Sequence, residues 1–85
     1  MPALKAHHPG AILRVEFMEP IALTPYRLAK ALGVRLPRVN DIVLEKRAIS
    51  AEMGLLLSAY FATSDQFWIN LQADYDRPSR SIHSP

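Results

Sequence analysis

Apolar residues recur along this chain at intervals of three or four, which is the spacing of a helix with one buried face. The first such run extends from Pro9 to about Glu19, with Leu13 and Phe17 on the same side. We expect Pro20 to end this helix, because proline lacks the backbone N–H that an inner helical turn requires. The sequence shows no β-hairpin signal and no internal repeat, so the pattern predicts an all-α fold.

Two short helices separated by a tight turn are predicted next. Thr24 and Pro25 form a start signal, because a hydroxyl side chain can cap a helix whose first residue is proline. This helix covers 24–33 and ends at Gly33, the residue type that best tolerates a left-handed backbone beyond a helix end. The second helix covers 35–44. This arrangement is the helix-turn-helix plan, in which the first helix supports and the second recognises.

After a polar loop, the same spacing predicts two further helices, which brings the total to five. Ser50 supplies the hydroxyl cap of the fourth helix, and Thr63 or Ser64 that of the fifth. The fourth helix carries a wide apolar face composed of Met53, Leu56, Leu57, Tyr60 and Phe61.

Large apolar side chains of the last helix predict a contact with a second subunit. Phe67 and Trp68 are adjacent, so they point about 100° apart on a helix and should not both fill one narrow seam within the chain. We expect one to face the core and the other to face the partner. The predicted dimer interface comprises Phe67, Trp68, Leu71 and Tyr75. A chain this short has a thin core, which also favours a dimer.

The length of 85 residues leaves room for one domain, 1–85. We expect its folded core to span about 8–76, with loose polar tails at 1–6 and 79–85. No apolar run approaches the roughly 20 residues that a membrane-spanning helix needs, and the N-terminus carries no apolar signal segment. Cysteine is absent, which excludes disulfides and thiolate zinc sites. These features predict a cytoplasmic protein that does not enter the membrane.

Charged residues are unevenly distributed, although the formal net charge is only +2. Residues 27–47 hold six lysines and arginines against two acidic residues, a balance of +4. Residues 48–76 hold four acidic residues and no lysine or arginine. The basic segment coincides with the predicted helix-turn-helix, and this coincidence favours double-stranded DNA as a partner.

Candidate DNA contacts follow from this plan. The recognition helix would present its unburied side to a major groove, where side chains read base edges. The residues predicted to contact bases are Arg35, Arg38, Asn40 and Asp41. The start of the supporting helix and the loop after the recognition helix would hold phosphates. The residues predicted to contact phosphates are Thr24, Tyr26, Arg27, Lys46 and Arg47.

Other chemistries find no support in the sequence. The chain has one other histidine besides His7 and His8, and this residue, His83, is far away in the sequence. The spacing typical of metal ligands is therefore not present. Asp74 and Asp76 are expected to be solvated, because no nucleophile or base stands at a usable spacing. We therefore expect no metal, no cofactor and no enzymatic activity. A helical packing unit whose arginines are merely solvated stays open as an alternative.

Five segments, in order and at matching spacing, resemble the HigA-type (VapI-like) antitoxins of addiction modules, which belong to the Cro/repressor-like helix-turn-helix superfamily. They are HPGAILRVEFMEP, YRLAKALGV, RVNDIV, KRAIS and FWINLQADYD, and together they cover about residues 7–76. The resemblance implies a five-helix Cro/repressor-like fold, commonly a homodimer, that binds a palindromic operator in its own promoter. It also implies that the protein neutralises a cognate toxin, typically a ribosome-dependent mRNA endonuclease.

The chain departs from this family pattern at several positions. Relatives usually carry glycine where this chain has Glu45, Ala48 and Ala62, and a positive φ at Glu45 would cost on the order of 1 kcal/mol relative to glycine. Relatives often carry arginine at the positions of Leu36 and Leu56, so weaker DNA binding is expected here. Two alternatives to the antitoxin stay open: a free-standing transcriptional regulator without a toxin, and a protein-binding module whose DNA contact has decayed.

Overall fold

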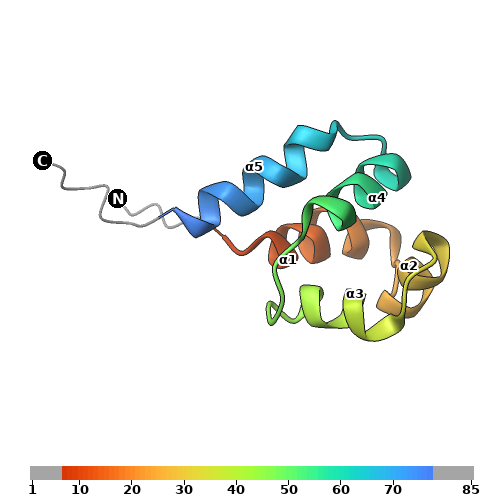
Figure 1. The fold of residues 1–85 in the computed structure, drawn as a ribbon. Coiled ribbons are helices and arrows are strands. Elements are labelled where there is room, and N and C mark those ends of the chain that lie inside the picture. The colour runs from red at the N-terminus through yellow and green to blue at the C-terminus, as the bar shows by residue number, and fades with distance from the viewer. Residues whose placement is uncertain (1–6, 78–85) are drawn as a thin grey trace, which may run out of the picture.

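Residues 7–77, the part of the chain that the computed structural model describes, contain the five predicted helical segments and no strand (Figure 1). The first segment joins α1 (Pro9–Ile12), a π-helical turn η1 (Leu13–Met18) and a 3₁₀ turn η2 (Glu19–Ile21). It is followed by α2 (Pro25–Leu32), α3 (Leu36–Val43), α4 (Ala51–Phe61) and α5 (Asp65–Asp76). The predicted tails, with His83, lie outside the described residues.

The first segment does not end at Pro20, so that prediction was wrong. The Glu19 backbone N–H donates to the carbonyl of Arg14, five residues earlier, as in a π-helical turn. Pro20 then falls in the first turn of η2, where a missing N–H leaves no helical hydrogen bond unmade. The segment ends at Ala22 instead, where φ is 54°.

Hydroxyl side chains begin three of the helices, as predicted. Thr24 Oγ1 accepts a hydrogen bond from the N–H of Arg27 at 3.2 Å. Ser50 Oγ accepts from Met53 at 3.1 Å, and Ser64 Oγ accepts from Phe67 at 3.1 Å. Ser64, rather than Thr63, is therefore the cap of α5. The Thr63 hydroxyl accepts a hydrogen bond from the Trp68 indole N–H instead, at 2.8 Å.

Four helical segments are followed, at once or after one more residue, by a residue with a left-handed backbone, and only one of these residues is glycine. They are Ala22, Gly33, Glu45 and Ala62, with φ of 54°, 74°, 64° and 58°. In each case the N–H of the following residue closes the helix by bonding to a carbonyl five residues back, at 2.8–3.0 Å. Glu45 thus has a positive φ, the conformation expected to cost free energy at this position, and Ala62 also has a positive φ. Ala48 does not.

The core is centred on Trp68, which is completely buried together with Leu28 and Leu57. Phe17 of η1 lies beside it, and its ring centroid is 5.0 Å from that of Trp68 and 5.8 Å from that of Phe67. The expectation that Phe67 and Trp68 cannot share one seam within the chain was therefore wrong. Both rings pack against Phe17 and also against each other, with the Phe67 and Trp68 centroids 4.9 Å apart.

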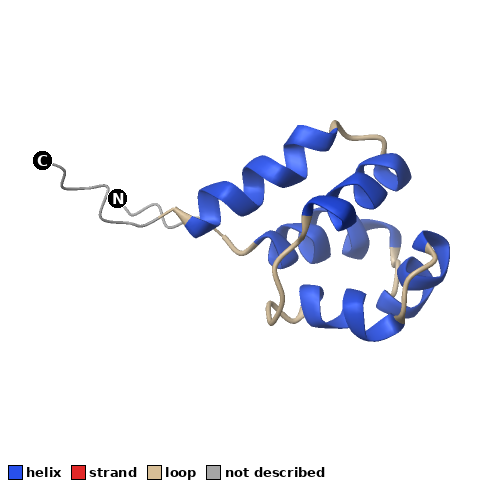
Figure 2. Ribbon diagram, viewed as in Figure 1, coloured by secondary structure: helices blue, strands red, loops and turns tan. Residues whose placement is uncertain are grey.

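Two helix pairs and a bridging segment make up the domain. Figure 2 shows α4 and α5 on one side and α2 and α3 on the other, and the α1 segment packs against both α3 and α5. Gly10 sits where α1 meets α3, and a Cβ atom placed there would be 1.8 Å from the carbonyl oxygen of Ile42. This close approach fixes α1 against the end of the predicted recognition helix.

Candidate nucleic-acid interface

The predicted helix-turn-helix is formed by α2, the turn at Gly33 and α3. Gly33 has φ 74°, and the Val34 N–H returns to the carbonyl of Ala29 at 3.0 Å. Ala29 is buried, as are Leu28 on the same helix and Val39 on α3. A small side chain at Ala29 lets the two helices approach closely. The two helices of the predicted helix-turn-helix are therefore present as α2 and α3.

The residues predicted to contact bases differ in how exposed they are on the outward side of α3. Val39, Ile42 and Val43 are buried and define the inner side of the helix. Arg35 is exposed at the helix start, where its side chain caps nothing. Asn40 is half-buried at the edge of the free face.

Arg38 and Asp41, also predicted to contact bases, are engaged within the chain. An Arg38 guanidinium nitrogen lies 3.9 Å from a carboxylate oxygen of Glu52, on α4. The Arg38 Nε atom is buried and has no hydrogen-bond partner within residues 7–77. Asp41 pairs with Arg47 at 3.7 Å. A DNA contact by either residue would therefore replace an existing ion pair.

The candidates for phosphate contact lie at both ends of the helix pair. Tyr26 is 59% exposed in the first turn of α2, next to an exposed Arg27. The Lys30 ammonium lies 5.8 Å from the centre of the Tyr26 ring, which adds a further cation on this side. Lys46 and Arg47 are exposed in the loop after α3. The Thr24 hydroxyl is occupied as the helix cap.

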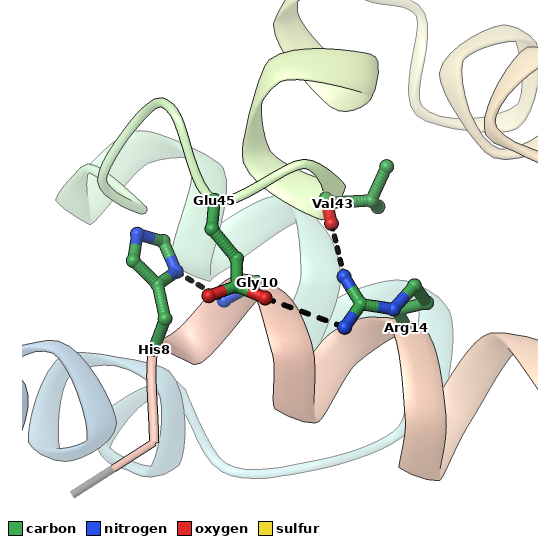
Figure 3. A network of polar contacts seen from close by, with 5 residues as sticks. All are labelled: His8, Gly10, Arg14, Val43 and Glu45. Carbon is green, nitrogen blue, oxygen red and sulfur yellow. Dashed lines mark hydrogen bonds and ion pairs between the residues drawn. The ribbon is translucent and has the colours of Figure 1, made fainter.

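The loop after α3 is held by Arg14, a residue that the sequence did not single out. Figure 3 shows its guanidinium between the carbonyl of Val43 and the carboxylate of Glu45. The nitrogen–oxygen distance to Glu45 is 3.3 Å. In the same view, His8 Nδ1 accepts a hydrogen bond from the Gly10 N–H at 2.9 Å, at the start of α1.

The four predicted dimer residues are not equally available. Trp68 has 0% exposure and belongs to the core of its own chain, so its inclusion in the interface has to be corrected. Phe67 and Leu71 are half-buried along α5. Tyr75 is 44% exposed, and its ring meets that of His8 edge-on at 4.8 Å.

Within residues 7–77, no group of three His, Asp or Glu side chains is arranged to hold a metal ion. No helix in that part of the chain combines the length and apolar character needed to cross a membrane.

Comparison with known proteins decides the family. No protein-family model matches the chain. Virulence-associated protein I of Dichelobacter nodosus is 47% identical over 76 residues, which are 89% of this chain and 68% of that protein. The structure titled Pseudomonas aeruginosa antitoxin HigA with the higBA promoter is 54% identical, with a TM-score of 0.81 over 82% of this chain and 76% of that one.

The chain belongs to the HigA family of helix-turn-helix antitoxins. A further Pseudomonas aeruginosa structure, of a protein with its 18-base-pair operator DNA, is 42% identical and has a TM-score of 0.85 over 98% of this chain and 99% of that one. The five-helix Cro/repressor-like fold that the sequence predicted is thereby confirmed. The relatives are antitoxins and transcriptional regulators, and this member of the HigA family is likewise not an enzyme.

Proposed function

We propose that this HigA-family chain is a DNA-binding antitoxin that represses its own operon and neutralises a cognate toxin. The α2–α3 hairpin carries the proposal, because it exposes Arg27 on one helix, Arg35 at the start of the next and Lys46 and Arg47 beyond its end. The relatives whose structures include promoter or operator DNA support it.

The side chains on α3 divide into two roles. Arg35 and Asn40 would read base edges, since an arginine can bond both acceptors of guanine and an asparagine both groups of adenine. Arg38 and Asp41 join them when DNA displaces Glu52 and Arg47 from their ion pairs. Arg27, Lys46 and Arg47, which lie outside α3, would bind phosphates. Such contacts position the helix on the DNA without reading its sequence.

A homodimer would present two copies of α3 to one palindromic operator. Recognition helices related by a two-fold axis read half-sites about 34 Å apart, in successive major grooves. We assign the dimer contact to the last helix, where Phe67, Leu71 and Tyr75 remain partly exposed.

Toxin capture would use another surface of the domain. Glu52, Asp74 and Asp76 are exposed on α4 and α5, in the half of the chain whose residues 48–76 lack lysine and arginine. An acidic surface of this kind favours association with a basic protein, and a basic mRNA-endonuclease toxin fits it. Both partners would meet in the cytoplasm, beside the operon.

The test is a salt-dependent titration of the pure protein against duplex DNA from just upstream of its reading frame. A scrambled duplex of the same length serves as the control. Specific binding should be at least about 10³-fold tighter than binding to the control. The Arg47→Ala variant should lose a similar factor on both duplexes and flatten the slope of log K against log salt by about one unit. Equal, weak binding to both duplexes would refute the proposal that the protein represses its own operon.

A protein-binding module without an operator is the second candidate, and one observation favours it. Arg38 and Arg47 are each paired with a carboxylate, at 3.9 Å and 3.7 Å, which reduces the positive potential that α3 and its loop offer to DNA. Equal binding to both duplexes, together with capture of the toxin encoded beside the gene, would establish this function. The absence of a toxin gene beside a specific binder would instead indicate a free-standing regulator.

A further inference from the structure

The end of α3 depends on a side chain from a distant part of the chain. The carbonyl of Asp41 accepts the Lys46 N–H at 2.8 Å, and that of Ile42 accepts the Glu45 N–H at 2.9 Å. The last carbonyl of the helix, that of Val43, accepts a hydrogen bond from the Arg14 guanidinium. Carbonyls at a helix end have no partner within the helix, so Arg14 satisfies one that would otherwise need water.

The same guanidinium also holds Glu45, two residues beyond the end of α3. Arg14 Nη1 reaches the Val43 carbonyl, and Nη2 lies 3.3 Å from Glu45 Oε2 (Figure 3). A planar guanidinium can bond two partners at once in fixed geometry, whereas a lysine ammonium cannot reproduce that fork. Gly10 lies one helical turn earlier and packs against the Ile42 carbonyl, so the segment that carries Arg14 is itself fixed to α3.

The charge of Glu45 makes this contact relevant to DNA. Glu45 precedes Lys46 and Arg47, the two loop cations assigned to phosphates. An unpaired carboxylate at that point would repel the DNA backbone and offset one of the cations. Figure 3 shows the Glu45 side chain directed toward the α1 segment, where Arg14 neutralises it.

We propose that Arg14 is a positioning residue for DNA binding. It fixes the loop at Glu45–Arg47 against the end of α3 and directs the Glu45 carboxylate toward itself, so that this carboxylate does not offset Lys46 and Arg47 where they would bind the DNA backbone. This inference rests on the proposed function, because it concerns the loop through which the protein would bind phosphate.

Variants of Arg14 test the contact in the operator titration. Arg14→Gln should weaken binding by about five- to tenfold, because it leaves the Val43 carbonyl and the Glu45 carboxylate without their partner. Arg14→Lys keeps the charge but should recover only part of the affinity. Arg77→Gln is the matched control, since Arg77 forms a similar exposed pair with Asp74 at 3.2 Å on α5. Full recovery by lysine would overturn the proposal in favour of a simple charge effect.

A double-mutant cycle separates positioning from direct DNA contact. Glu45→Gln removes the acid from an exposed position and should raise affinity about two- to fivefold. Arg14→Gln should then cost clearly less in the Glu45→Gln background than in the wild type, because the unpaired acid is gone. An equal loss in both backgrounds would overturn the proposal, since Arg14 would then act on DNA without Glu45.

A measurement without DNA distinguishes failure of this inference from failure of the proposed function. Arg14→Gln should speed amide hydrogen exchange at Lys46, whose N–H closes the end of α3, more than at Val34, whose N–H closes the end of α2. Equal acceleration at both sites would make Arg14 a general stabiliser and overturn the proposal. Selective acceleration in a protein that ignores its promoter would refute the proposed function and leave Arg14 fixing only the loop.

Discussion

Gly10 packs so closely on Ile42 that a Cβ atom at Gly10 would lie 1.8 Å from the Ile42 carbonyl oxygen. The contact joins α1 to α3 backbone to backbone, so no side-chain rotation can relieve an added methyl group. Ile42 is itself 1% exposed, and its carbonyl also accepts the Glu45 N–H that closes α3. The position of α3 therefore depends on the absence of a side chain at Gly10.

Gly10→Ala should consequently destabilise the protein by at least about 2 kcal/mol, because α1 has to move away from α3. For a domain of this size, that loss lowers Tm by roughly 10 °C. Thermal unfolding followed by circular dichroism measures it. Gly54→Ala is the matched control, since its Cβ would lie 3.3 Å from Trp68 Cβ and it should stay within about 1 kcal/mol of wild type. Equal Tm values for both variants would contradict the close approach.

A second prediction concerns the residue with a left-handed backbone at the end of α4, where a substitution should raise stability instead of lowering it. Ala62 has φ 58°, a conformation that costs an alanine about 1 kcal/mol and a glycine almost nothing. Ala62→Gly should therefore raise the free energy of unfolding by up to about 1 kcal/mol, less what glycine adds to the entropy of the unfolded chain. Urea denaturation is the measurement. Ala59→Gly, at an exposed position inside the same helix, should lower stability by about 1 kcal/mol. A loss at both positions would argue against the strain at Ala62.

The ion pair between Arg38 and Glu52 leads to a third prediction, on DNA affinity. With 74% of its side chain exposed, Glu52 contributes little to stability but holds Arg38 toward α4. Glu52→Gln should release Arg38 for DNA and strengthen operator binding by up to about fivefold, with the larger gain on the specific duplex. Glu16→Gln, which removes the same charge from an exposed site on η1, is the control. An equal gain from both variants, on both duplexes, would indicate net charge alone.

The sequence predicted the helix pair because its signals are local. Thr24 and Gly33 determine where α2 begins and ends through contacts within a few residues. The role of Arg14 left no such signal, since its partners lie 29 and 31 residues away along the chain. A contact of that kind depends on how α1 docks on α3, and no spacing in the sequence records it.

The predictions for Pro20 and for the pair Phe67 and Trp68 were wrong for different physical reasons. A regular α-helix would end at Pro20, but the π-helical turn η1 shifts the hydrogen bonds by one residue and lets the chain pass through it. Phe67 and Trp68 lie on the regular helix α5, and their rings are nearly perpendicular, with centroids 4.9 Å apart. Phe17 packs against both rings, so the three form one cluster. The angle between neighbouring positions on one helix could not predict a contact with a third ring from η1.

The burial of Trp68 changes how the proposed dimer should be tested. Trp68→Ala removes a completely buried side chain and should cost about 3–5 kcal/mol, which unfolds much of so small a domain whatever its oligomeric state. Tyr75→Asp acts on a residue that is 44% exposed, near the end of α5. It should leave the helical circular dichroism spectrum intact and convert the dimer to a monomer, because it places a charge in an apolar contact.

Sedimentation equilibrium of the wild type, Tyr75→Asp and Ile69→Asp decides the point. Ile69 is 38% exposed on the same helix and lies outside the proposed interface, so its variant should remain a dimer. A folded Tyr75→Asp protein that still sediments as a dimer would move the interface away from α5. Loss of the dimer in both variants would instead extend the interface across the exposed side of that helix. Because two recognition helices are needed for a palindromic site, the monomeric variant should also lose its operator affinity while it keeps its weak binding to scrambled DNA.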